Sequence, residues 1–67
     1  MMNNWVKVYS NSQYFKSEMV KQVLIDHEIE AVIMNKQDSS YKFGMVEVHV
    51  EESNEERAKQ IIEENDL

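Results

Sequence analysis

The chain has 67 residues, a net charge of −6 and no cysteine. A chain of this length makes one domain, expected to span residues 1–67, with a small core. The missing cysteines exclude disulfides and thiolate metal sites, and the excess of acids disfavours nucleic acids and anionic membranes as partners. No segment has the length or pattern of a membrane span or a signal peptide, so we expect a cytoplasmic protein with no membrane partner.

The amino-terminal half predicts one strand and one helix. Residues 5–9 alternate with a period of two, which is typical of a strand. Asn11 and Ser12 follow and are good N-cap residues. A helix over about residues 12–28 is predicted by an apolar stripe, expected to face the core: Phe15, Met19, Val20, Val23 and Leu24.

The carboxyl-terminal half predicts two further strands and a second helix. Residues 29–35 are β-branched and apolar, and residues 45–50 alternate cleanly, so both segments indicate strands. Ser53 and Glu56 have the spacing of a capping box at the start of a helix over about residues 54–65. Ala58, Ile61 and Ile62 mark the apolar face of that helix.

The order of elements is β-α-β-β-α, which predicts an α+β sandwich. A right-handed crossover leaves room for the third strand between the first two, giving an antiparallel sheet in the order 1-3-2. Both helices then cover one face. The expected architecture is ferredoxin-like without the usual last strand.

Strand alternation predicts an apolar face on the side of the sheet that has no helices. A contiguous exposed patch of this kind typically marks a contact surface, and we expect self-association through it. The alternatives are that these residues are scattered, that the carboxyl-terminal segment covers them, or that the register of the second strand slips by one residue. The face comprises Trp5, Tyr9, Val32, Met34, Met45 and His49, among Lys7, Glu30 and Glu47.

The segment 35–44 is predicted to connect the second and third strands. Asp38, Ser39 and Ser40 are turn formers, and Gly44 can adopt a positive φ. Tyr41 and Phe43 either tuck under the sheet edge or serve as exposed anchors for a protein partner. The predicted partner-binding loop comprises Lys36, Gln37, Asp38, Ser39, Ser40, Tyr41, Phe43 and Gly44, with Lys42 adding a polar contact.

The sequence contains no recognisable catalytic or cofactor motif. Gly44 is the only glycine, so no phosphate-binding glycine loop exists. His27 and His49 lack the spacing of metal ligands, and Glu47 with His49 is the only near candidate for an acid–base pair. We therefore expect neither an enzyme nor a cofactor or metal.

The chain resembles a family of small bacterial domains described as prokaryotic signal-transducing proteins. The resemblance covers about residues 4–64 and is carried by WVKVYS, SEMVKQVLIDHEIEA, VIMNKQDSSYKFG and EVHV. It implies a ferredoxin-like fold similar to that of the P-II nitrogen regulators, in which the corresponding loop binds partners. ATP binding and trimerisation are not implied, because this loop is far shorter and the last strand and glycine-rich nucleotide loop are missing.

These observations favour a non-catalytic regulatory or protein-binding module, with loop 35–44 and the helix-free sheet face as its contacts. The expected partner is another protein or a second copy of the chain. The alternative is a small-molecule sensor that holds its ligand between the loop and the sheet.

Overall fold

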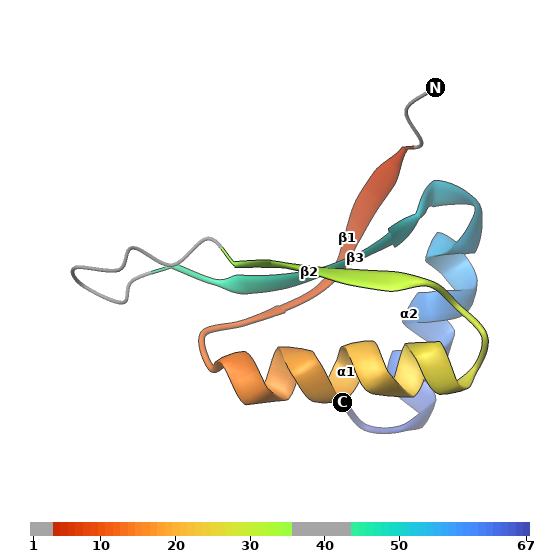
Figure 1. Cartoon of the computed structure of the whole chain (residues 1–67). Coiled ribbons are helices and arrows are strands. Elements are labelled where there is room, and N and C mark those ends of the chain that lie inside the picture. Colours follow the sequence, from red (N-terminus) through yellow and green to blue (C-terminus); the bar gives the residue numbers. More distant parts are fainter. Residues whose placement is uncertain (1–3, 36–43) are drawn as a thin grey trace.

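The computed structural model describes residues 4–35 and 44–67, and the elements follow the expected β-α-β-β-α order (Figure 1). A short 3-10 helix, η1, precedes the second α-helix. The elements are β1 (Trp5–Asn11), α1 (Tyr14–Asp26), β2 (Ala31–Asn35), β3 (Val46–Glu51), η1 (Glu52–Asn54) and α2 (Glu55–Glu64).

The three strands form one antiparallel sheet in the order β1-β3-β2, which confirms the predicted topology. The central strand β3 pairs with β2 in regular register, from Ala31 opposite Val50 to Asn35 opposite Val46. On its other side β3 pairs with β1, where the register shifts between Lys7 and Tyr9. This shift is a β-bulge, in which two residues of one strand oppose one residue of the other.

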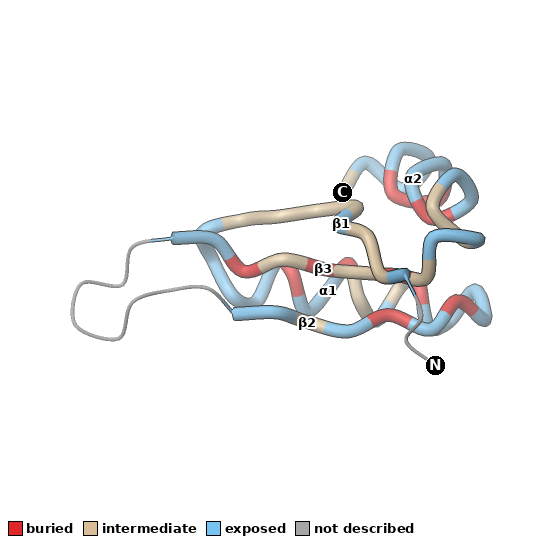
Figure 2. Tube along the Cα trace, turned by 90° about the horizontal axis from the view of Figure 1, so that it is seen from above, coloured by how far each residue is buried: buried red, intermediate tan, exposed pale blue. Residues whose placement is uncertain are grey.

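The core lies between one face of the sheet and the two helices. Val46, Val48 and Val50 point to this face and are fully buried, whereas the residues between them are partly exposed; Figure 2 shows the alternation along β3. Ala58, Ile61 and Ile62 of α2 join the core as predicted. Both helices therefore cover the same face.

The buried stripe of α1 differs from the predicted one. Val20 and Leu24 are buried as expected, and Val23 is partly buried. Phe15 and Met19 were expected in the core, but their exposed fractions are 61% and 52%. That prediction is wrong because the helix turns a different set of residues, spaced three and four apart, toward the sheet: Ser17, Val20 and Leu24.

Ser17 occupies the first position of this stripe and is completely buried. Its hydroxyl donates a hydrogen bond to the carbonyl oxygen of Val46, at 2.7 Å. A small hydroxyl at this position lets α1 approach the end of β3 closely, and the hydrogen bond compensates for its burial.

The helices begin without the predicted side-chain caps. Gln13 is the N-cap of α1 and makes no side-chain cap bond; the Oδ1 of Asn11 instead accepts a hydrogen bond from the Gln13 amide at 2.8 Å. The capping box predicted at Ser53 and Glu56 is also wrong, because Ser53 lies within η1 and Asn54 is the N-cap. The 3-10 turn leads the chain from β3 into α2 in its place.

Both helices end in the same way. After α1, Glu28 adopts a positive φ of 65°, and the amide of Ile29 donates to the carbonyl of Leu24 at 2.9 Å. After α2, Asp66 has a φ of 56°, and the amide of Leu67 donates to the carbonyl of Ile62 at 3.1 Å. These are Schellman endings, in which an apolar residue folds back onto the helix. Ile29 and Leu67 thereby return to the core.

Candidate functional site

The helix-free side of the sheet, here called the outer face, is built by the residues that alternate with the buried valines. On β3 these are Glu47, His49 and Glu51. The register places Lys7 and Val32 opposite His49, Met34 opposite Glu47, and Trp5 opposite Glu51. The outer face therefore carries residues from all three strands, as predicted.

The centre of the outer face is polar. The Nε2 atom of His49 lies 2.9 Å from Oε1 of Glu47, and the Lys7 ammonium lies 3.9 Å from the other carboxylate oxygen. The side chains of His49 and Glu47 are only 13% and 14% exposed, although no helix covers them. The pair is therefore largely shielded from solvent.

The borders of the outer face are apolar. Val32 and Met34 on β2 and Met45 just before β3 are exposed, with fractions of 40%, 44% and 41%, while Trp5 on β1 is partly buried. Val32 and Met34 lie on β2, whereas Trp5 lies on β1, across the polar centre from them. Exposed apolar side chains on one sheet face are typical of contact surfaces. We call Trp5, Val32, Met34 and Met45 the outer-face patch.

Tyr9 does not belong to the outer face, contrary to the prediction. The bulge after Lys7 shifts the alternation, so that Tyr9 lies opposite the inward-facing Val48 and packs against the core. A bulge adds one residue to a strand and thereby reverses the sides of all residues beyond it. The sequence contains no glycine in β1 that would have indicated this shift.

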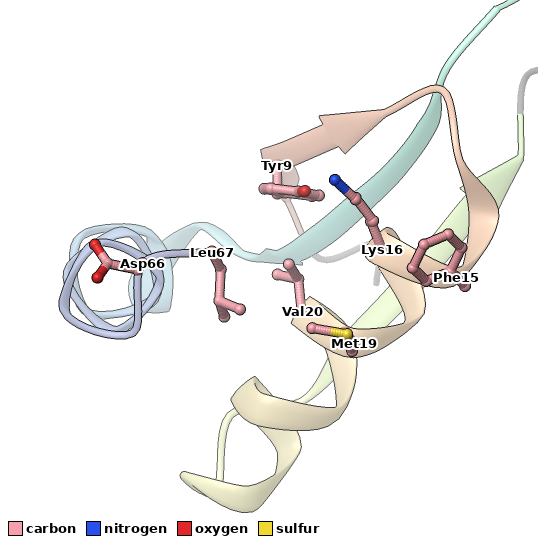
Figure 3. A pocket seen from close by; sticks show the side chains of 7 residues that line it. All are labelled: Tyr9, Phe15, Lys16, Met19, Val20, Asp66 and Leu67. Atoms are coloured by element: carbon pink, nitrogen blue, oxygen red, sulfur yellow. The ribbon is translucent and has the colours of Figure 1, made fainter.

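The displaced Tyr9 helps to form a groove on the helix side of the molecule. It lies between the second half of β1, the first turns of α1 and the residues that follow α2 (Figure 3). Its volume is about 170 Å³. We call it the α1 groove; its lining residues are Tyr9, Phe15, Lys16, Met19, Val20, Asp66 and Leu67.

The α1 groove was not predicted from the sequence, because Phe15 and Met19 were expected to lie in the core. The helical periodicity could have indicated the groove. If Ser17, Val20 and Leu24 face the sheet, then Phe15 and Met19 lie beside this stripe and not within it. A serine in an apolar stripe is easily read as a solvent-facing position, and only the contact with Val46 shows why it lies inside.

Most of the predicted partner-binding loop lies outside the described residues, and so does part of the ligand site proposed for a small-molecule sensor. Gly44 is described, and its φ of 101° confirms the predicted positive φ at the entry to β3. The other loop residues of the prediction belong to the range that the structure does not describe: Lys36, Gln37, Asp38, Ser39, Ser40, Tyr41 and Phe43.

The two histidines are far from forming a joint site. His27 follows α1, where its Nδ1 lies 2.9 Å from the carbonyl oxygen of Val23, while His49 pairs with Glu47 on the sheet. Within residues 4–35 and 44–67, no three His, Cys, Asp or Glu side chains converge as metal ligands would. In the same ranges, neither helix is long and apolar enough to cross a membrane.

A comparison with protein families identifies a match for this chain. The family model described as "Putative prokaryotic signal transducing protein" matches residues 5–66. No curated protein and no solved structure matches the chain. Since the match covers all helices and strands, the chain belongs to this family of prokaryotic proteins.

Proposed function

We propose that this protein is a non-catalytic regulatory module that acts through protein contacts, and that its outer face joins two copies of the chain. The observation that carries the proposal is the outer-face patch: a sheet with helices on one side only presents exposed apolar residues on the other. The family description, which points to signal transduction, supports a regulatory role. Loop 35–44, with Tyr41 and Phe43, is proposed to contact a further protein partner.

The charges at the centre of the outer face suit a symmetric pair of copies. In a two-fold interface the same surface meets itself, so each charged group needs an opposite charge on that same surface. Lys7 and Glu47 provide such a couple, 3.9 Å apart. In the proposed dimer the two-fold axis passes between Lys7 and Glu47, so that the cation of each copy faces the anion of the other, while the outer-face patch supplies the apolar contacts.

Sedimentation velocity over a range of concentrations tests this proposal. The mass of the wild-type protein should rise from that of a monomer to that of a dimer. Met34→Glu introduces a charge into the outer-face patch and should weaken the dimer by at least about tenfold, because a charge without a partner is costly in an apolar contact.

The matched control is Met19→Glu, which makes the same substitution at a similarly exposed methionine on the helix side. It should dimerise like the wild type, and circular dichroism should show that both variants are folded. A wild-type protein that stays monomeric at all concentrations would refute the self-contact. Loss of the dimer in Met19→Glu alone would move the interface to the α1 groove.

A further inference from the structure

We propose that the α1 groove is a second contact site, distinct from the outer face, and that it binds an extended peptide segment of a partner protein. An apolar side chain of this segment enters the groove, and an acidic residue close to it pairs with Lys16. The proposal starts from exposed apolar side chains on the first turns of α1. Tyr14, Phe15 and Met19 are exposed by 49%, 61% and 52%. None of them belongs to the core, to which α1 contributes its buried residues Val20 and Leu24.

The size of the groove indicates what enters it. Pockets for drug-sized ligands measure roughly 300–1,000 Å³. The α1 groove measures about 170 Å³, which suits one apolar side chain better than a whole small molecule. Its walls come from Phe15, Met19, Val20 and Leu67, with Tyr9 at one side, so the entering group is apolar.

The strand next to the groove explains why the segment is extended. β1 is an edge strand, because β3 occupies one of its sides and no described strand pairs with the other. An edge strand offers free backbone groups to an added strand, which is a recurrent mode of peptide recognition. Neighbouring strands lie about 4.8 Å apart, so inward side chains of a strand added to β1 lie beside Tyr9, over the groove.

The charge at the mouth of the groove indicates that the bound peptide carries an acidic residue. The Lys16 ammonium makes no ion pair with any described residue, and Figure 3 shows it rising beside Tyr9. Asp66 lines the far end, with its carboxylate turned away from Lys16 (Figure 3). An acidic residue of the partner can therefore pair with Lys16, which is exposed at the mouth of the groove.

Selection of random dodecapeptides displayed on phage, with the full chain as target, tests the proposal. We expect enrichment of peptides that combine β-forming residues, one large apolar residue and an acid close to it. A selected peptide should bind Lys16→Glu at least about tenfold more weakly than the wild type. Lys21→Glu makes the same charge change on α1 outside the groove and should alter the affinity by less than about twofold.

Two further variants separate this site from the proposed dimer. Met19→Glu should lose peptide binding, whereas Met34→Glu, whose substitution lies on the outer face, should retain it even as a monomer. The proposal is overturned if no such peptides are enriched, or if they bind Lys16→Glu and Met19→Glu with wild-type affinity. It is also overturned if Met34→Glu still self-associates through the groove, because a second copy is then the occupant.

Discussion

The two faces of the sheet differ most in what the central strand presents to each of them. On the helix side, Val48 and Val50 pack in one core with residues from both helices, and Val46 is fully buried as well. On the outer face, β3 contributes Glu47 and His49, yet β2 adds exposed Val32 and Met34 beside them. The solvated face of an antiparallel sheet is usually polar along its strands. The helix side is a core, and the exposed apolar residues of the other side are the basis for proposing the outer face as a contact surface.

The largest expected effect is a difference in the free energy of unfolding between substitutions on the two sides of the sheet. Leu24→Ala removes a side chain that is 0% exposed and should lower the free energy of unfolding by about 2–5 kcal/mol. Met34→Ala, on the outer face, should change it by no more than about 0.5 kcal/mol. Urea unfolding at low protein concentration, where self-association does not contribute, measures both values.

Equal losses in the two variants would contradict this division. They would mean that Met34 is as well packed within one copy as Leu24, and the outer face would then no longer qualify as a contact surface.

A smaller effect concerns the one buried polar side chain among the described residues, Ser17. Ser17→Ala removes the hydrogen bond from the Ser17 hydroxyl to the carbonyl of Val46 and should lower the free energy of unfolding by about 1–3 kcal/mol. Ser53→Ala is the control, since the exposed Ser53 makes no cap bond. This substitution should lower the free energy of unfolding by less than about 0.5 kcal/mol. If Ser53→Ala were the more damaging, the capping box expected from the sequence would exist in solution.

The smallest expected effect concerns Glu28, the residue with a positive φ that follows α1. Glu28 adopts a left-handed conformation that glycine tolerates better, so Glu28→Gly should raise the free energy of unfolding by about 1 kcal/mol. Glu18→Gly makes the same change inside α1 and should lower it by about 1 kcal/mol. Thermal unfolding of the two variants should therefore shift in opposite directions. A common sign would rule out the Schellman ending after α1.

The sequence predicts the topology well because the strongest signals come from regular elements. The alternation of residues 45–50 indicated a central strand buried on one side, and β3 is that strand. The stripe of Ala58, Ile61 and Ile62 placed α2 correctly. In both cases a single periodic pattern coincides with a single buried face.

The candidate surfaces were predicted less well, for two physical reasons. The bulge in β1 depends on the pairing with β3, which no local pattern encodes, and it moves Tyr9 to the other side of the sheet. On α1, large apolar residues dominated the reading of the stripe, although the buried position was taken by Ser17. The same two errors hid the α1 groove, which depends on Tyr9, Phe15 and Met19 together.

The Schellman ending of α2 has a practical consequence for attaching the protein to a surface or a carrier. It turns Leu67 back toward α1, so that anything joined after this residue starts at the wall of the α1 groove. A carrier attached there therefore crowds the α1 groove and leaves the outer-face patch, on the opposite side of the sheet, accessible.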